Sequence, residues 1–293
     1  MRIPFTKMQA YGNDYVYINA MKVDIKDWNR LAIAISDRHF GVGSDGMILI
    51  CDSQSDDFRM RVFDPDGTEC EMCGNALRSV SKYVYYYGLT RKTEFTIETI
   101  GGHKQVSLEV ANSEVVSIHA NIGRPVFDAS KVVVDLERLK SFNPEYDAEQ
   151  GELMECPIEV EGRTFKLSSL SWGNPHTVMF IDDVDSLDIE KYGPAIENHP
   201  IFPNRTNVTF AQIIDRSHIK IREWERGCGE TIGCGTGCCT ALVFAARLGM
   251  CDRKAEVMQI GGPLKVEWDE EDRVHMIGPS TVVYEGEYIY EAE

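Results

Sequence analysis

The sequence predicts a mixed α/β fold made of two similar lobes, on three observations. Segments with strand-like apolar patterns alternate with helical ones along the chain. Two helices, over residues 75–87 and 236–248, each stop at a glycine, Gly88 and Gly249. The two halves also carry the same motifs at the same spacing, and 293 residues suffice for two domains of about 150 residues each.

Helices are expected where apolar residues recur with the period of a helix, and strands where they alternate or form a short run. Residues 28–38 form a helix, because Leu31, Ala32 and Ile35 share one face. Residues 47–51 form a short apolar strand, and residues 58–63 alternate as a half-buried strand does. Further strands are expected at residues 94–99, 104–110, 115–120, 177–181, 219–224 and 264–268. The segment 126–151, with Pro144 and mixed charge, is expected to link the two halves.

An internal repeat relates the two halves. The separation of Asn13 from Cys73 along the chain equals that of Asn174 from Cys234. The shift that carries position 73 onto 234 also superposes positions 60–61 on 221–222, 63–64 on 224–225, 69 on 230 and 88 on 249. We therefore expect a first lobe over residues 1–120 and a second, of the same ancestral fold, over residues 121–277.

Charge and composition exclude several classes of protein. The chain has 30 Lys and Arg against 47 Asp and Glu, a formal charge of −17. Such a chain repels phosphate backbones and anionic lipids, and no basic patch offsets this, so nucleic-acid binding is not expected. No apolar run approaches the roughly 18 residues of a membrane span, and the N-terminus has no export signal. We expect a cytoplasmic protein that does not bind membranes.

Two of the nine cysteines begin predicted helices: Cys73 precedes Gly-Asn, and Cys234 precedes Gly-Thr. A helix N-terminus has unpaired N–H groups and partial positive charge, which hold a carboxylate and lower the pKa of a thiol toward the thiolate. One such cysteine would most simply be a buried structural residue. Two at equivalent places in a repeat favour a catalytic pair.

Two lobes that close on a cleft would bring these helix N-termini face to face. A carboxylate held between them would have one thiol on each side of its α-carbon. One thiolate could then remove the α-proton while the opposite thiol delivers another, which inverts the stereocentre. The carbanion would be stabilised by the two helix dipoles, so no cofactor is needed, and the sequence offers no obvious site for one.

The motifs resemble those of the diaminopimelate epimerase family. They occur in family order at residues 7–14, 37–43, 66–75, 173–176, 205–208, 225–231 and 234–237. The resemblance implies an isomerase, independent of pyridoxal phosphate, that interconverts LL- and meso-2,6-diaminopimelate in lysine and peptidoglycan-precursor synthesis. It also implies a homodimer, and a C-terminal strand within about 278–293 that returns to the first lobe.

Carried over by position, the resemblance also implies roles for individual residues. Cys73 and Cys234 would be the acid/base pair, with Glu225 and His176 close enough to influence proton transfer. The residues that hold the substrate would be Gly74, Asn75, Gly235 and Thr236 at the α-carboxylate, Glu225 at the amino group, Arg226 at the distal carboxylate, and Asn13, Asn174 and Asn207 at the distal end.

Asp64 departs from the family pattern, which commonly has Asn at this position. An Asn amide can both donate to a distal carboxylate and accept from a distal ammonium, whereas an ionised Asp64 only accepts. Either Asp64 favours the distal ammonium, or the substrate is another amino acid that lacks the second carboxylate. Thr177 and the cysteines at 238 and 239 are lesser departures, which we attribute to packing.

Other functions are possible on narrower grounds. Cys70 and Cys73, with Cys234 and Cys238, could form a thiolate metal site, but the glycines that follow would then have no purpose, and no metal is expected. The glycines at 41, 43 and 46 match a dinucleotide fingerprint, but a helix precedes them and a strand follows, so we assign a turn. A proline-racemase-like chain would have His in place of Asn75, and phenazine-pathway isomerases lack the cysteine pair.

Overall fold

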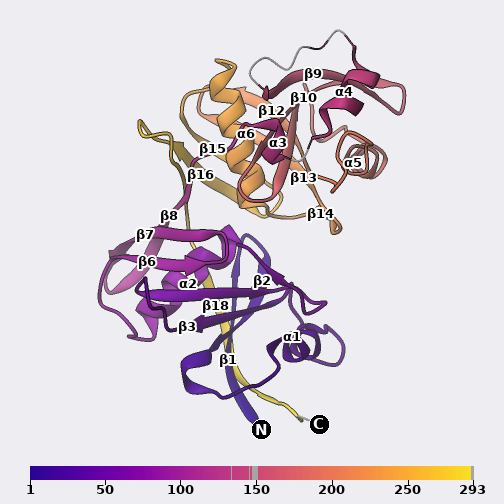
Figure 1. The fold of residues 1–293 in the computed structure, drawn as a ribbon. Helices are drawn as coiled ribbons and strands as arrows, with labels where there is room; N and C mark the ends of the chain where they lie inside the picture. The colour runs from indigo at the N-terminus through magenta and orange to yellow at the C-terminus, as the bar shows by residue number, and fades with distance from the viewer. Residues whose placement is uncertain (133, 145, 147–150, 292–293) are drawn as a thin grey trace. The chain divides into compact units, whose positions relative to one another are not determined.

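The computed structural model of the chain describes residues 1–132, 134–144, 146 and 151–291. The described chain divides into two compact units (Figure 1). The first comprises Met1–Asn121 together with Ile277–Glu293, and the second comprises Ile122–Met276. The C-terminal strand thus lies in the same unit as the N-terminus, and Tyr290 N donates to Met1 O at 2.9 Å.

The first unit is one sheet with a helix on each face. Its strands pair in the order β18-β1-β2-β3-β4-β6-β7-β8. The elements are β1 (Arg2–Ala10), β2 (Asn13–Asn19), η1 (Ala20–Lys22), α1 (Trp28–Ser36), β3 (Met47–Cys51), β4 (Phe58–Phe63), β5 (Glu69–Cys70), α2 (Gly74–Tyr86), β6 (Glu94–Thr99), β7 (Gly102–Ala111), β8 (Glu114–Gly123) and β18 (Thr281–Ile289).

Strand alternation divides the apolar residues of this sheet between the two helices. Tyr17 and Ile48 belong to the core under α2, whereas their neighbours Ile18 and Leu49 belong to the core under α1. Successive strand residues point to opposite faces, so a strand that is buried on both sides is apolar throughout. This explains the continuous run of apolar residues at 47–50.

The second unit repeats this plan. Its strands pair in the order β9-β10-β11-β12-β13-β15-β16. The elements are α3 (Ala129–Val132), α4 (Leu136–Phe142), β9 (Leu153–Val160), β10 (Arg163–Ser171), β11 (Pro175–Phe180), α5 (Ile189–Glu197), β12 (Asn207–Asp215), β13 (His218–Glu225), β14 (Gly229–Thr231), α6 (Gly235–Arg247), β15 (Lys254–Gln259), β16 (Gly262–Trp268) and β17 (Val274–Gly278).

The expectation of two similar lobes is confirmed. Both units show the same run of pairings: β1–β2 and β10–β11 are antiparallel, β2–β3 and β11–β12 parallel, β3–β4 and β12–β13 antiparallel, and β4–β6 and β13–β15 parallel. Helices α1 and α5 begin at positions 28 and 189, and α2 and α6 begin at positions 74 and 235. Both pairs are related by the shift that carries Cys73 onto Cys234, so the repeat found in the sequence extends to every central element.

The expected link at residues 126–151 is wrong for its described part. Val126 pairs with Ser171 and Asp128 with Glu152, and helices α3 and α4 pack into the core of the second unit through Val132 and Leu139. The chain passes from the first unit to the second between positions 121 and 122, within β8, and returns between positions 276 and 277, within β17. Positions 133, 145 and 147–150 of the expected link lie outside the described residues.

The glycines predicted to stop the two long helices do so by adopting positive φ. Gly88 has φ 70° and Gly249 has φ 71°, directly after the C-caps Tyr87 and Leu248. A side chain disfavours this left-handed conformation, so glycine is the usual residue there. The glycine-rich segment 41–46 lies between α1 and β3, as the assignment to a turn requires.

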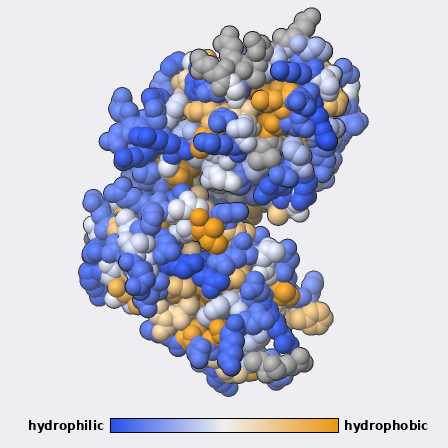
Figure 2. Space-filling view, in the orientation of Figure 1, coloured by the Kyte–Doolittle hydropathy of each residue, from blue (hydrophilic) through white to orange (hydrophobic). Residues whose placement is uncertain are grey.

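The surface agrees with the high charge of the chain. On the visible face of each unit, most residues are hydrophilic, with apolar residues scattered among them (Figure 2). Among the described residues, no helix has both the length and the apolar character that a membrane crossing requires.

Candidate active site

Each expected catalytic cysteine is the N-cap of the central helix of its unit. The Cys73 sulfur accepts a hydrogen bond from Ala76 N at 3.5 Å at the start of α2. The Cys234 sulfur accepts from Gly237 N at 3.4 Å at the start of α6. A side chain that caps a helix satisfies one of its unpaired first-turn N–H groups. The repeat therefore places two thiols in equivalent positions.

In the first unit, Cys73 adjoins a set of polar groups from β2 and α2. The Oδ1 of Asn13 lies 3.6 Å from the Cys73 sulfur and 3.3 Å from Asn75 Nδ2. The buried phenol of Tyr15 is within hydrogen-bonding reach of the Cys73 thiol, and burial raises the pKa of Tyr15. Asn13 and Asn75 thus lie where the sequence motifs predicted, at the thiol.

Asp64 lies in the same unit and accepts a hydrogen bond from the Cys70 thiol at 2.7 Å. Burial raises the pKa of Asp64 above its ordinary value. The second unit repeats this contact, since Glu225 occupies the equivalent position and accepts from Thr231 Oγ1 at 2.5 Å. Asp64 and Glu225 are therefore equivalent carboxylates in the two units, and Cys70 is the hydrogen-bond partner of Asp64.

Two bidentate ion pairs stabilise the hairpins in which Asp64 and Glu225 lie. Arg61 contacts Glu69 through Nε at 2.8 Å and NH2 at 2.7 Å, and Arg222 contacts Glu230 at 2.7 and 3.1 Å. The first pair joins β4 to the short strand β5, and the second joins β13 to the short strand β14. Each short strand precedes the catalytic cysteine of its unit. Such planar two-point contacts hold geometry as well as charge.

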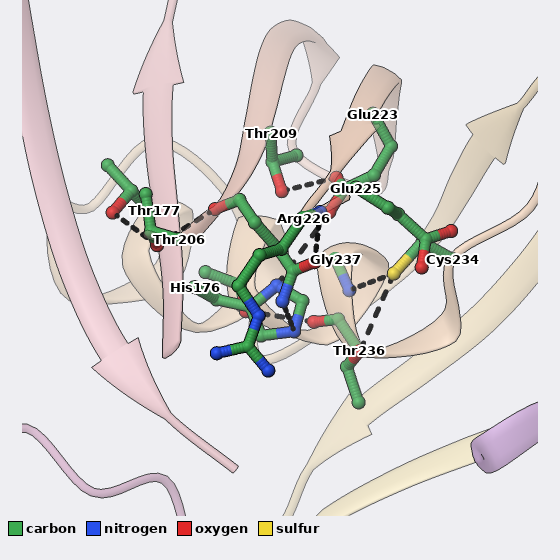
Figure 3. Close-up of polar contacts among 12 residues, drawn as sticks. His176, Thr177, Thr206, Thr209, Glu223, Glu225, Arg226, Cys234, Thr236 and Gly237 are labelled. Carbon is green, nitrogen blue, oxygen red and sulfur yellow. Dashed lines mark hydrogen bonds and ion pairs between the residues drawn. The ribbon is translucent and has the colours of Figure 1, made fainter. Parts of the chain in front are cut away.

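The thiol of Cys234 is buried, with 7% of the residue exposed. Its sulfur also lies 3.5 Å from Thr236 Oγ1 (Figure 3). Burial, followed by the nearby Glu225 and Glu223, raises the pKa of Cys234 well above its ordinary value. The expectation that the helix N-terminus lowers this pKa overall is wrong for the structure described, because desolvation outweighs the Gly237 N–H and Thr236 hydrogen bonds.

His176 is fully buried on β11, and its imidazole is neutral. Burial, with a smaller effect of the Arg226 charge, lowers the pKa of His176 to about 3. Its Nε2 lies 3.5 Å from Asn207 Nδ2, and its Nδ1 lies 3.7 Å from Glu223 Oε1. A neutral imidazole can accept at Nε2 only if the proton is on Nδ1, and that proton then faces Glu223.

Asn207 ties the remaining predicted residues of the second unit together. Its Oδ1 accepts from Arg226 N at 2.9 Å, and its Nδ2 donates to Pro175 O at 3.0 Å. The Arg226 guanidinium is half-buried and lies 3.4 Å from Asn204 O. Asn174 is half-buried at the start of β11, and its carbonyl accepts from Trp172 N at 3.2 Å. Gly74 and Gly235 begin the two helices and are buried.

Three buried side chains at this site were not predicted. Arg78 is fully buried and donates to Asn75 Oδ1 at 2.5 Å, which fixes the first turn of α2. Glu197 accepts from Trp224 Nε1 at 2.8 Å and Gly227 N at 2.9 Å, which anchors the loop after Glu225.

The third unpredicted side chain, Glu223, is buried on β13. The alternation of Ile219 and Ile221 could have revealed it, because the next inward position along the strand is 223.

Thr177, which we attributed to packing, has a buried hydroxyl that forms hydrogen bonds with Ser169 Oγ at 2.8 Å and Thr206 Oγ1 at 3.1 Å.

Over the described ranges, no three His, Cys, Asp or Glu side chains come together in an arrangement that suits a metal ion. Of the four cysteines considered as thiolate ligands, Cys70 contacts Asp64, and Cys238 contacts Gln259 Oε1 at 3.4 Å. Both contacts use the thiol as a hydrogen-bond donor.

Comparisons with known proteins agree with the motifs. The sequence profile described as "Diaminopimelate epimerase" matches residues 5–127 and 168–283. Proteins named diaminopimelate epimerase from Acetivibrio thermocellus and Methanococcus maripaludis are 42% and 43% identical over 284 residues. These alignments cover 97% of this chain in both cases, and 97% and 98% of the relatives.

Solved structures share the fold at low sequence identity. A phenazine biosynthesis protein of the PhzF family from Bacillus anthracis has a TM-score of 0.69 at 19% identity, over 99% of this chain and all of that one. A hydroxyproline epimerase from Agrobacterium vitis has a TM-score of 0.66 at 11% identity, over 98% and 92%. On the strength of the profile and the full-length relatives, the chain belongs to the diaminopimelate epimerase family of isomerases.

Proposed function

We propose that the chain interconverts LL- and meso-2,6-diaminopimelate without a cofactor, by exchange of one α-proton between two cysteines. The observation that carries this proposal is the equivalence of Cys73 and Cys234, each the N-cap of the central helix of its unit. The names of the full-length relatives support the substrate.

In the proposed reaction, the thiolate of one cysteine removes the α-proton, and the thiol of the other protonates the opposite face of the carbanion. The two sulfurs exchange roles in each turnover, so atoms and charge balance without an added group. First-turn N–H groups at Gly74, Asn75, Gly235 and Thr236 would hold the α-carboxylate and stabilise the negative charge that develops beside it.

The remaining predicted residues would orient the substrate. Glu225 would accept from the amino group near the reacting carbon. The Arg226 guanidinium would pair with the distal carboxylate, whose two oxygens fit its fork. Asn13, Asn174 and Asn207 would supply amide groups to the distal end, and neutral His176 would contribute to proton transfer through its neighbours.

A related racemase acting on a monocarboxylic amino acid is the second candidate, because Asp64 stands where the family commonly has Asn. The test is a purified-chain assay with LL- and meso-diaminopimelate beside a panel of monocarboxylic amino acids. We expect the highest kcat/KM with diaminopimelate. Comparable or faster racemisation of a monocarboxylic amino acid would contradict the proposed substrate.

For the assembly, we propose a cytoplasmic homodimer, on the resemblance to the family. Light scattering after size-exclusion chromatography measures the mass directly. The expected value is twice the 33.1 kDa of one chain. A stable monomer at the concentrations used in the activity assay would contradict the proposed dimer.

A further inference from the structure

Glu223 is a carboxyl group buried directly beneath the first turn of α6. Only 3% of the residue is exposed. A methyl group added at Gly237 would lie 2.4 Å from Glu223 Oε2, so the helix backbone rests against the carboxyl. Burying an ionisable side chain in this way costs free energy unless the side chain is hydrogen-bonded or paired with another group.

The groups around Glu223 include the Cys234 thiol. Thr209 Oγ1 donates to Glu223 Oε2 at 2.5 Å from the neighbouring strand β12 (Figure 3). The Cys234 sulfur meets the same turn, since Gly237 N donates to it at 3.4 Å, and a hydrogen bond from the Cys234 thiol lowers the pKa of Glu223. The other oxygen, Oε1, faces His176 Nδ1 at 3.7 Å, and neither of these two atoms has a hydrogen-bond partner among the described residues.

The first unit lacks this arrangement. The shift that carries Cys73 onto Cys234 places Val62 at the position of Glu223 and Ile48 at that of Thr209. The register is the same in both units, since Ile48 pairs with Val62 and Thr209 pairs with Glu223. Two apolar side chains in one lobe thus replace a carboxyl and its hydroxyl donor in the other.

We propose that Glu223 is the proton partner of Cys234, a positioning residue that sets whether this thiol or its own carboxyl carries the single negative charge of the pair. The exchange moves one proton from sulfur to a carboxylate oxygen, and the electron pair of the S–H bond stays on sulfur as the thiolate. The reverse transfer restores the thiol. No oxidant or other reactant is involved.

Two features of the site confine the pair to one charge. Burial raises the pKa of both Glu223 and Cys234, and the charges of Glu225 and Glu223 raise the pKa of Cys234 further, so an ionised Glu223 disfavours a thiolate at Cys234. The groups that face the pair are Glu225 on the same strand, which disfavours further negative charge, and the neutral His176 from β11. Thr209 stabilises the ionised carboxylate by donating to it.

The test follows the Cys234 thiol itself, so that it does not depend on activity. Chain labelled with ¹³Cβ-cysteine is titrated by NMR, and the Cys234 signal is identified by its loss in Cys234→Ser. Groups that interact by more than about one pK unit titrate in two macroscopic steps. We expect two steps at Cys234 in the wild type and one step in Glu223→Gln, which keeps the size of the side chain but cannot ionise.

A second variant, Thr209→Val, tests the hydrogen bond to Glu223, and Thr177→Val is its control. Thr209→Val removes the hydroxyl that supports the carboxylate, and we expect the lower step at Cys234 to move to higher pH. Thr177→Val removes an equally buried hydroxyl, bonded to Ser169 and Thr206, and should leave both steps in place. A single step in the wild type, or two unshifted steps in Glu223→Gln, would overturn the proposal.

The role of Glu223 in turnover rests on the proposed two-cysteine reaction. Since Glu223 acts through Cys234, we expect kcat to fall roughly tenfold or more in Glu223→Gln with KM unchanged. An inactive wild type that still shows the two-step titration would refute the proposed function alone. An unchanged titration refutes the role of Glu223, whatever the activity.

Discussion

At the scale of single residues, burial disfavours the charged forms of two ionisable side chains in the second lobe. Burial raises the pKa of Glu223 well above 4.5 and lowers that of His176 to about 3. The two effects act on stability at opposite ends of the pH range. Above pH 4.5 the unfolded state gains stability by ionising Glu223, and below pH 6.5 it gains stability by protonating His176.

Glu223→Gln should therefore stabilise the fold in a pH-dependent way. As the pH rises above 4.5, the wild type loses stability because its folded carboxyl keeps a proton that the unfolded chain releases. The amide variant avoids this loss, by up to about 1.4 kcal/mol per pH unit while the folded carboxyl stays neutral. Urea unfolding at pH 5 and pH 8 measures it. A difference that does not grow with pH would contradict the raised pKa of Glu223.

The His176 prediction has the opposite sign. The folded imidazole stays neutral down to a pKa of about 3, so stability should be lost as the pH falls from 6.5 toward 3. His176→Asn should unfold less steeply over this range, by up to about 1.4 kcal/mol per pH unit. Acid unfolding followed by circular dichroism measures the slope. Equal slopes for the two proteins would show that His176 is charged when folded.

Asp64→Asn should change the pH dependence of catalysis. We expect kcat/KM for diaminopimelate to rise roughly two- to fivefold at pH 8, because an amide does not repel a distal carboxylate, as an exposed like charge does by up to about 1 kcal/mol. The gain should shrink as the pH falls toward the raised pKa of Asp64. A ratio of variant to wild type that is constant with pH would contradict a charge effect.

At the scale of elements, the start of α6 is fixed by contact between Gly237 and Glu223. Gly237→Ala should lower stability by about 1–3 kcal/mol, because the methyl group would meet the buried carboxyl at 2.4 Å. The double variant Gly237→Ala/Glu223→Ala should regain much of this loss. Gly249→Ala is the control: it has open space and should lose only about 1–2 kcal/mol to its positive φ. Thermal unfolding measures these stabilities. A double variant no more stable than Gly237→Ala would contradict a clash between the added methyl group and Glu223.

The elements differ in how far the sequence revealed them. Helices α2 and α6 were predicted because a terminal glycine marks each one. Helix α5 was missed, because Gly193 and Pro194 break the helical pattern. Glycine is present at position 193 because of tertiary packing: a Cβ there would lie 2.6 Å from the Trp224 ring, so only glycine fits.

The candidate site was predicted where motifs mark it and missed where only packing does. The two cysteines, Glu225 and His176 lie in the motifs that repeat or match the family. Glu223 lies in no motif, and its importance arises from the neighbouring strand and the helix above it. The pKa of Cys234 was predicted in the wrong direction, since the sequence shows the helix N-terminus but not the depth of burial.

At the scale of the whole molecule, duplication gave two copies of one fold whose sites have diverged. The pairing of strands and the bounds of the central helices are shared. The groups beside the thiols are not, since Tyr15 adjoins Cys73 and Glu223 adjoins Cys234. The chain has a net charge of −17, whereas the proposed carboxylate sites are two helix N-termini and Arg226.

The measurement that tests the two-cysteine reaction most directly is α-proton exchange in D2O. Wild type, Cys73→Ser and Cys234→Ser would each be given LL- and meso-diaminopimelate, with epimerisation and deuterium uptake followed together. We expect the wild type to incorporate solvent deuterium at the inverted carbon, and each variant to lose epimerisation by roughly 100-fold or more. Full epimerisation in either single variant would contradict a reaction that needs both thiols.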